Sequence, residues 1–289
     1  MSVILLQNHY LQARIQPHGA ELQSLLHTNG IEYMWQAGSA WPKHSPVLFP
    51  IVGSLVGGRY QHHGQAYSLP RHGFARDHLF DTIDQTDTRC VLQLRSTPAM
   101  QLQYPFLFVF EIAYQLQQHS LSVTYSVQNE GEELMYFSVG GHPAFAWPLV
   151  AGSQPQQHYL QWQPPVAAQR WLLHDGLLSG QTADTALNAE GQLPLSAELF
   201  AKDALVFRNW GVQRVTYASH DHNHGLHFDC ADFPDFGIWS APGGAFVCLE
   251  PWCGHADLVQ HQGQLSQKAG IIALEGGQQH SRSWQVTCF

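Results

Sequence analysis

The sequence predicts an all-β protein, and three observations support that prediction. In many short segments apolar residues alternate with polar ones at a period of two, which is the pattern of half-buried strands. Clusters of Gly and Pro separate these segments, as expected where a chain turns between strands. Segments with a helical period are few. Sheet therefore makes up most of the predicted structure.

The clearest strands form a predicted hairpin in the middle of the chain. In segment 106–116 every second residue from Phe108 to Leu116 is apolar, and segment 121–128 shows the same alternation. The polar residues 117–120 between them predict a hairpin turn. The same reasoning predicts strands at 90–95, 245–250 and 282–288, an edge strand in residues 1–12, and a hairpin turn at 29–30.

Two segments between the strands need a separate interpretation. Residues 195–202 are amphipathic and predict a helix of about two turns. The Gln/Pro-rich segment 154–165 resembles a linker, but its Tyr159, Leu160 and Trp162 predict a packed loop. Because no composition shift divides the chain, residues 1–289 are expected to form one domain.

Composition narrows the class of protein. The formal charge of −9 comes without any basic run, so nucleic acid is not an expected partner. No apolar segment approaches the ~20 residues that span a bilayer, and no basic region precedes the short apolar run at the start, so neither a membrane partner nor a signal peptide is expected. The five cysteines are widely spread, which predicts reduced thiols and a cytoplasmic location.

Two segments carry a histidine in an unusual context. Segment 69–77 places His72 close to two arginines, and segment 139–145 places His142 between paired glycines and a proline. The proline favours an extended conformation at His142, and the glycines permit close backbone approach. A histidine held in this way could donate a proton. With 19 histidines in the chain, the alternatives are a structural or solvated His72 and a His142 that caps a carbonyl.

A third segment, 245–252, ends an apolar strand with a carboxylate. A period of two places Glu250 on the same face as Phe246 and Cys248, and Trp252 follows closely. An acid in apolar surroundings is costly to bury, so it is usually paired or catalytic. The alternative is a structural Glu250 that closes a buried hydrogen-bond network.

Five motifs in register now carry a resemblance to a known family. They keep their order over nearly the whole chain and lie at 46–53, 71–76, 141–145, 236–240 and 248–252, with a further similar segment at 268–274. The sequence resembles the aldose 1-epimerase (galactose mutarotase) family, and especially its LacX-like branch. The resemblance implies a β-supersandwich, a stack of large twisted antiparallel sheets with a sugar site in a groove.

The resemblance also implies catalytic roles. Glu250 is similar to the family's general base and His142 to its general acid. Opening a pyranose takes the proton from O1 and protonates the ring oxygen O5, which calls for a base and an acid at opposite sides of the sugar. Glu250 as a carboxylate and His142 as an imidazolium meet that need, and neither a cofactor nor a metal is expected.

Further residues are expected to hold the sugar. His72 is similar to the family's second histidine at the sugar, Asp203 to its substrate-binding aspartate, and Arg76 is expected to bind hydroxyls with them. Trp252 is a candidate platform for a sugar face, with Phe74 as an alternative. Trp239 is expected in the core.

One position departs from the family pattern. The family usually has an arginine directly after the glycine that ends segment 46–53, and here that position is Ser54. The contact that the family's arginine makes is then lost or supplied by another arginine. The candidates are Arg71, Arg76 and Arg59.

Three other classes of function stay open. Ser54 favours a non-catalytic sugar sensor. A glycoside hydrolase or lyase on the same fold would need a carboxylate pair, for which Asp257 is the candidate beside Glu250. A metal enzyme is suggested by His222, His224 and His227, although a solvated hairpin is the preferred interpretation of that cluster. The expected ligand is an aldohexose, with a hexose 6-phosphate as alternative, and the chain is expected to be a monomer or homodimer.

Overall fold

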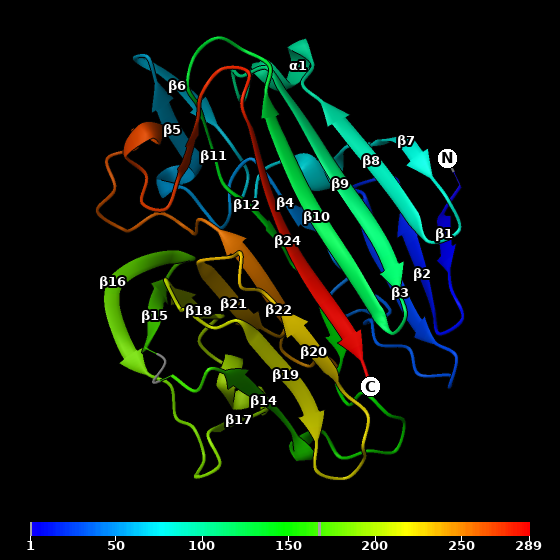
Figure 1. The fold of residues 1–289 in the computed structure, drawn as a ribbon. Coiled ribbons are helices and arrows are strands. Elements are labelled where there is room, and N and C mark those ends of the chain that lie inside the picture. Colours follow the sequence, from blue (N-terminus) through cyan, green and yellow to red (C-terminus); the bar gives the residue numbers. More distant parts are fainter. Residues whose placement is uncertain (1, 167–168) are drawn as a thin grey trace.

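The computed structural model describes residues 2–166 and 169–289, which fold into antiparallel sheets with little helix (Figure 1). The largest sheet has nine strands in the order β17-β14-β19-β20-β24-β10-β9-β8-β7. The second has eight, in the order β16-β15-β18-β21-β22-β12-β4, with β13 also paired to β22. The prediction of an all-β supersandwich is confirmed.

The strands of the nine-stranded sheet are β17 (Gln192–Pro194), β14 (His158–Gln163), β19 (Arg214–Ser219), β20 (Leu226–Asp229), β24 (Gln279–Cys288), β10 (Ser120–Asn129), β9 (Phe108–Gln117), β8 (Arg89–Arg95) and β7 (Asp81–Gln85). Those of the eight-stranded sheet are β16 (Leu177–Asp184), β15 (Gln169–His174), β18 (Leu205–Arg208), β21 (Asp235–Trp239), β22 (Phe246–Cys253), β12 (Val139–Gly141), β4 (Val47–Leu48) and β13 (Ala144–Ala146).

Smaller elements surround these two sheets. The small sheets are β1 (Ile4–Gln7), β2 (Leu11–Gln16) and β3 (Glu21–His27); β5 (Arg59–His62) with β6 (Gln65–Ser68); and β11 (Met135–Phe137) with β23 (Ile272–Leu274). The helical pieces are α1 (Pro98–Gln101) and the 3-10 turns η1 (Val56–Gly58), η2 (Ala75–Asp77), η3 (Pro155–Gln157), η4 (Ala197–Phe200) and η5 (Leu265–Gln267).

The predicted central hairpin is present as β9 and β10. Leu116 pairs with Leu121, and the chain reverses between Gln117 and Ser120. Gln118 has a φ of 51°, the left-handed conformation that such a tight turn requires. Buried and less buried residues alternate along both strands, so their apolar faces turn to the interior.

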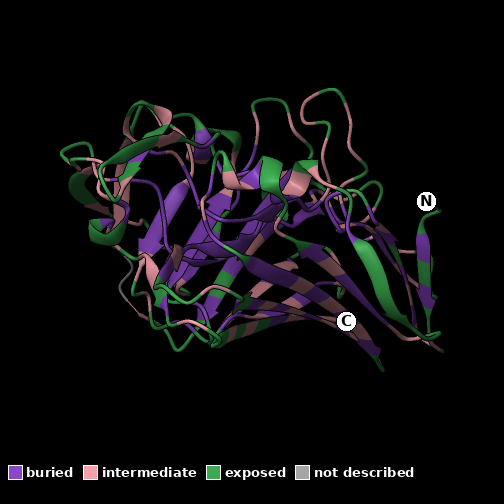
Figure 2. Ribbon diagram, turned by 90° about the horizontal axis from the view of Figure 1, so that it is seen from above, coloured by how far each residue is buried: buried purple, intermediate pink, exposed green. Residues whose placement is uncertain are grey.

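The core lies between the two large sheets, where buried residues concentrate in Figure 2. Phe49, which follows β4, stacks on Phe110 of β9 with ring centroids 4.6 Å apart. Phe236 of β21 meets Phe228 of β20 edge to face at 5.8 Å. Aromatic side chains from both sheets interlock in this core. One face of the eight-stranded sheet is therefore packed rigidly against the nine-stranded sheet.

Two segment predictions were wrong. Segment 154–165 is not a loop: it contains β14, whose Leu160 and Trp162 alternate with glutamines and pack into the core. Segment 195–202 forms only η4 and not two helical turns. Asp203 follows with a φ of 111°, which ends any right-handed helical path, and so short a segment has too few turns to sustain a helix.

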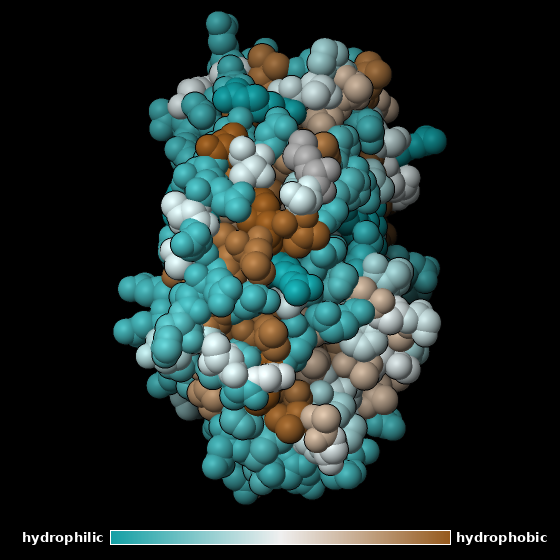
Figure 3. Space-filling model, turned by 90° about the vertical axis from the view of Figure 1, so that its right-hand side faces the viewer, coloured by the Kyte–Doolittle hydropathy of each residue, from teal (hydrophilic) through white to brown (hydrophobic). Residues whose placement is uncertain are grey.

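β1 and β7 are edge strands of their sheets. The N-terminal edge strand is confirmed as β1, and β7 closes one end of the nine-stranded sheet. β7 is exposed along its whole length but carries Asp81 and Asp84, charges that discourage pairing with another edge. Figure 3 shows this side of the molecule as mostly hydrophilic, with apolar side chains in separate patches. No helix among the described residues is long and apolar enough to cross a bilayer.

Candidate functional site

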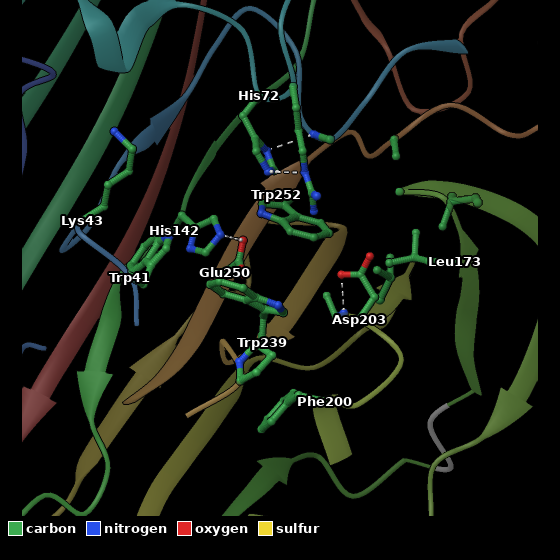
Figure 4. A pocket seen from close by; sticks show the side chains of 18 of the residues that line it. Trp41, Lys43, His72, His142, Leu173, Phe200, Asp203, Trp239, Glu250 and Trp252 are labelled. Atoms are coloured by element: carbon green, nitrogen blue, oxygen red, sulfur yellow. Dashed lines mark hydrogen bonds and ion pairs between the residues drawn. The ribbon is translucent and has the colours of Figure 1, made fainter. Parts of the chain in front are cut away.

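A cavity of about 530 Å³ opens beside the eight-stranded sheet and gathers the predicted site residues (Figure 4). This volume falls within the ~300–1,000 Å³ common for small-molecule sites. The seven predicted site residues in its lining are Arg71, His72, Arg76, His142, Asp203, Glu250 and Trp252. They come from four separate parts of the chain, so the fold alone brings them together.

Glu250 lies at the centre of the cavity wall. It belongs to β22, where it pairs with Gly237 of β21, and only 1% of its surface is exposed. As the period of two predicts, the side chains of Phe246 and Cys248 lie along the same strand face, inside an aromatic cluster. A rigid central strand therefore fixes the position of the carboxyl group.

His142 faces Glu250 directly. Its Nε2 lies 3.3 Å from Oε2 of Glu250, and Trp41 stacks on the imidazole with centroids 5.0 Å apart. Trp239 meets the same ring edge-on at 5.6 Å. The imidazole is thus clamped between two indoles, with one edge turned to the carboxyl group (Figure 4).

Burial shifts the pKa values of both groups of this pair. It raises the pKa of Glu250 well above its usual value, an effect that Arg71 opposes and Asp203 reinforces. Burial also lowers the pKa of His142 to about 3. Both shifts favour the neutral carboxyl group and the neutral imidazole over the expected carboxylate and imidazolium.

His72 is held by backbone on a turn beneath the cavity. Its φ of 67° and the φ of 70° at Gly73 are left-handed, and a Cβ on Gly73 would lie 2.3 Å from the carbonyl oxygen of Phe49. The Gly53 N–H donates to Nδ1 of His72 at 3.1 Å. Burial lowers the pKa of this imidazole well below its usual range, so it is neutral.

The tautomer of His72 follows from that backbone bond. Nε of Arg71 lies 3.2 Å from Nε2 of His72, yet a neutral imidazole has one lone-pair nitrogen and cannot accept at both. The amide of Gly53 is a fixed donor, which assigns the lone pair to Nδ1. Nε2 of His72 then carries the proton and is available as a donor to a ligand.

Cationic side chains form one side of the cavity. Arg76 donates from Nη2 to the carbonyl oxygen of Arg71 at 2.8 Å. A Cβ on Gly176 would lie 3.5 Å from Oγ of Ser54 and 3.9 Å from Nη1 of Arg71. The guanidinium of Arg71 therefore reaches the space beside Ser54. Arg59, the third candidate to replace the family's arginine, lies exposed on β5 and does not line the cavity.

Asp203 enters the cavity from the loop between η4 and β18. Its backbone N–H donates to the carbonyl oxygen of Phe200, and its own Oδ1 accepts from the Ala204 N–H at 2.7 Å. The left-handed φ of 111° is uncommon outside glycine, although aspartate adopts it more readily than most residues. This backbone turn directs the carboxylate into the cavity (Figure 4).

Two glycines make room for Trp252. A Cβ on Gly237 would lie 2.4 Å from Cζ2 of the Trp252 indole, and one on Gly140 would lie 2.7 Å from Cδ1. The indole therefore lies flat across the neighbouring strands and forms part of the cavity wall. Such a face is a suitable surface for the apolar side of a sugar.

Sequence reasoning misplaced or missed four residues. Trp239 lines the cavity and is half-buried, so its expected place in the core was wrong, whereas Phe74 is a core residue. Trp41 and Lys43 also line the cavity and were not predicted. Recognising Trp239 required the strand register, because Trp239 pairs with Cys248, two residues from Glu250.

The residues that suggested other functions have their own partners. Asp257 is buried, pairs with Lys268 at 3.0 Å and accepts from the Val56 N–H, so it does not form a carboxylate pair with Glu250. Asp203 is the second carboxylate of the cavity. His222 lies 3.8 Å from Asp221, and Nδ1 of His227 lies 3.0 Å from Oγ1 of Thr216. These contacts are those of a hairpin.

Two groups among the described residues bring potential metal ligands within 4.8 Å of one another. One is His142, Cys248 and Glu250 in the cavity wall, and the other is His62, His63 and Glu133 at the surface. Burial raises the pKa of the Cys248 thiol well above its usual value, which disfavours the thiolate that binds metals. Metal independence stays a prediction.

Comparison with known proteins decides the family. A model of the aldose 1-epimerase family matches residues 2–175, more than half of the chain. The chain belongs to the aldose 1-epimerase family. Within it, the chain is 28% identical to protein LacX of Lactococcus lactis subsp. lactis, over 98% of both chains.

Solved structures of related proteins share the fold. A galactose mutarotase related enzyme from Lactobacillus acidophilus is 32% identical, with a TM-score of 0.95 over 100% of this chain and 97% of that one. A galactose mutarotase-like protein from Lactobacillus casei is 29% identical, with a TM-score of 0.93 over 100% of both chains. The family resemblance inferred from the five motifs is thereby confirmed.

Proposed function

We propose that this member of the family is an active aldose 1-epimerase, which interconverts the α and β anomers of a free aldohexose. The observation that supports this most strongly is the contact of 3.3 Å between His142 and Glu250. Both groups have strongly shifted pKa values and face a cavity of suitable size for a sugar. Titratable pairs of this kind are typical of acid/base sites.

The geometry suits proton transfer at the anomeric centre. A base and an acid at opposite sides of the sugar were expected, whereas Glu250 and His142 lie 3.3 Å apart. Because O1 and O5 of a pyranose are bonded to the same carbon, adjacent groups can still reach both oxygens. One group takes the O1 proton while the other protonates O5 and the C1–O5 bond opens; closure reverses both transfers. The pair holds one proton before and after the cycle, so the reaction needs no cofactor.

The proposed roles require the charged form of the pair. In this proposal a proton shifts from Glu250 to His142, which gives the carboxylate that acts as base and the imidazolium that acts as acid. The charge of Arg71 stabilises the carboxylate in that arrangement. Each group is then expected to contribute the ~10²–10⁴-fold typical of general acid/base catalysis.

The remaining residues bind and orient the sugar in this proposal. Nε2–H of His72 and the guanidinium of Arg76 donate to hydroxyls, and Asp203 accepts from hydroxyls. Arg71 supplies the positive charge beside Ser54 that the family's arginine would otherwise bring. Trp252 packs against the apolar face of the ring.

Anomer exchange measured by NMR on a panel of free aldohexoses tests the proposal. We expect catalysed exchange for at least one sugar, at a rate unaffected by added cofactors. Sugar binding without exchange would contradict the enzyme and indicate a sensor. A cytoplasmic location and a monomeric or homodimeric state remain predictions.

A second candidate substrate is a hexose 6-phosphate. Three cationic residues, Lys43, Arg71 and Arg76, line the cavity, and arginine binds phosphate through paired N–H donors. The net charge of −9 opposes the approach of anions at long range. Turnover of hexose 6-phosphates that is equal to or weaker than that of free hexoses removes this candidate.

A further inference from the structure

A second, smaller cavity lies where the two large sheets meet, outside the candidate site. It has a volume of about 220 Å³ and is closed by the ends of β18, β21 and β22 on one side and by β24 on the other. The charged or titratable residues in its lining are Arg208, Asp235, Cys253, His255, His280 and Arg282. The volume is below the ~300 Å³ of the smallest typical organic-ligand sites, so it suits an ion better than a sugar.

Arg208 has no acidic partner within ion-pair distance among the described residues, although its charge acts on its cross-strand neighbour Asp235. Its guanidinium stacks over the ring of Trp171 at 4.3 Å, and within residues 2–166 and 169–289 its side chain makes neither a hydrogen bond nor an ion pair. Its Nε is buried with no acceptor. A guanidinium oriented by an aromatic face keeps its N–H edge free for a planar or tetrahedral anion.

Arg282 approaches the same cavity from β24. Its Nη1 donates to the neighbouring carbonyl oxygen of Ser281, and no described carboxylate lies within ion-pair distance of it. The carboxylate of Asp235 is already occupied, because its oxygens accept from the N–H groups of Asn209 and Gly254. Two cations and one carboxylate therefore leave the lining of the cavity with an excess positive charge.

Both histidines of the lining have lowered pKa values, which is the effect expected of burial and of nearby positive charge. Burial lowers the pKa of His255 to about 3, with further lowering by Arg208 and Lys268. Burial and Arg282 lower the pKa of His280 to about 4. Nε2 of each of these histidine rings is buried without a partner in the described part of the chain. Nδ1 of His255 lies 2.8 Å from the carbonyl oxygen of Ala256 and therefore carries the proton, so Nε2 of His255 is an acceptor and does not bind an anion. The unpaired donor of the lining is Nε of Arg208, and Nε2 of His280 supplies a second in the tautomer that protonates it. Buried polar groups normally have partners, so these donors call for an occupant.

We propose that this cavity binds a small oxyanion of the phosphate or sulfate class between Arg208 and Arg282. The site is separate from the sugar cavity, but one loop borders both: Gly254 and His255 line the anion cavity, and the next residue, Ala256, lines the sugar cavity. The inference does not depend on the proposed epimerase activity.

Calorimetric titration of the whole protein with inorganic phosphate, and separately with sulfate, tests this site. The measurement belongs in a low-chloride buffer, because salt screens such contacts. We expect binding by the wild type and at least tenfold weaker binding by Arg208→Gln and by Arg282→Gln. Arg14→Gln, on β2, serves as the matched control that binds as the wild type does, and Arg71→Gln, which removes a cation of the sugar cavity, detects anion binding in that cavity instead.

The location is tested independently by crystals soaked in selenate, an anomalous scatterer with the shape of sulfate. A selenate peak between Arg208 and Arg282 supports the proposal even if Arg208→Gln fails to fold. The proposal is overturned if neither anion binds the wild type, if both variants bind phosphate as the wild type does, or if only Arg71→Gln abolishes binding.

Discussion

Nε2 of His142 lies 3.3 Å from Oε2 of Glu250, and each group is held by a rigid element behind it. Glu250 belongs to a central strand, and His142 is clamped by Trp41 and Trp239. Burial raises the pKa of Glu250 and lowers that of His142, so both shifts favour the neutral groups. A prepositioned acid/base pair of this kind suits reversible ring opening.

His142→Gln is expected to lose most anomer exchange while keeping its fold. Gln fills a similar volume but neither gives nor takes a proton near neutral pH, so the rate should fall by ~10²–10⁴-fold. His227→Gln is the control, since His227 is also partly buried with a lowered pKa but lies outside the cavity. NMR exchange rates and melting temperatures of both variants make the comparison. Unchanged exchange in folded His142→Gln would exclude this imidazole from the chemistry.

Gly237→Ala is expected to weaken sugar binding by displacing Trp252. The new Cβ would lie 2.4 Å from the indole, and overpacking of this kind costs ~1–3 kcal/mol of folding stability. In the Gly237→Ala/Trp252→Phe double variant the smaller ring relieves the clash. Its stability loss, measured by urea unfolding, should be less than the sum of the two single losses. Additive losses would show that Gly237 does not act through Trp252.

Folding stability is expected to fall as pH drops below 6.5. His72, His142 and His255 have folded pKa values below the unfolded value of about 6.5, so the unfolded chain takes up protons first. Each contributes up to ~1.4 kcal/mol per pH unit between 6.5 and its folded pKa. Glu250 acts oppositely: its folded pKa is raised, so its contribution is present at low pH and is lost as pH rises through that value.

His255→Gln checks this prediction, because it removes one of these protonations outside the sugar cavity. Urea unfolding at several pH values between 7 and 4 should give a shallower decline for the variant. A decline equal to that of the wild type would show that His255 is not held neutral in the folded protein.

Chelation is expected to leave anomer exchange unchanged. The proposed reaction moves only protons, and Cys248, the third potential ligand beside His142 and Glu250, is a buried thiol of raised pKa. The measurement compares exchange rates before and after EDTA treatment. Loss of exchange that zinc or manganese restores would contradict the proposed chemistry.

The strands were predictable where one face is buried and the other is not. β9, β10 and β24 show this pattern, and a period of two identified all three. β14 was missed because prolines and glutamines around Leu160 and Trp162 resemble a loop, and its pairing with β17 and β19 shows it to be a strand. The short segment at η4 has helical spacing without enough length for a helix.

The candidate site was predictable where a motif carries a titratable residue in an unusual local context. Glu250, His142 and His72 met that condition, and all three line one cavity. Trp41 and Lys43 carried no such signal, because their place in the cavity depends on contacts between residues distant in sequence, such as those of Trp41 with His142 and Phe246. The raised pKa of Glu250 was also beyond the sequence, since burial and not residue type determines it.

The most direct test of the account is anomer exchange in Glu250→Gln, measured by NMR together with the sugar dissociation constant and the melting temperature. Gln keeps the size and one acceptor oxygen but cannot accept the O1 proton. We predict exchange reduced by at least ~10²–10⁴-fold, which is ~3–5 kcal/mol in barrier, with sugar binding and melting temperature largely retained. Full exchange in a well-folded Glu250→Gln protein would contradict the account.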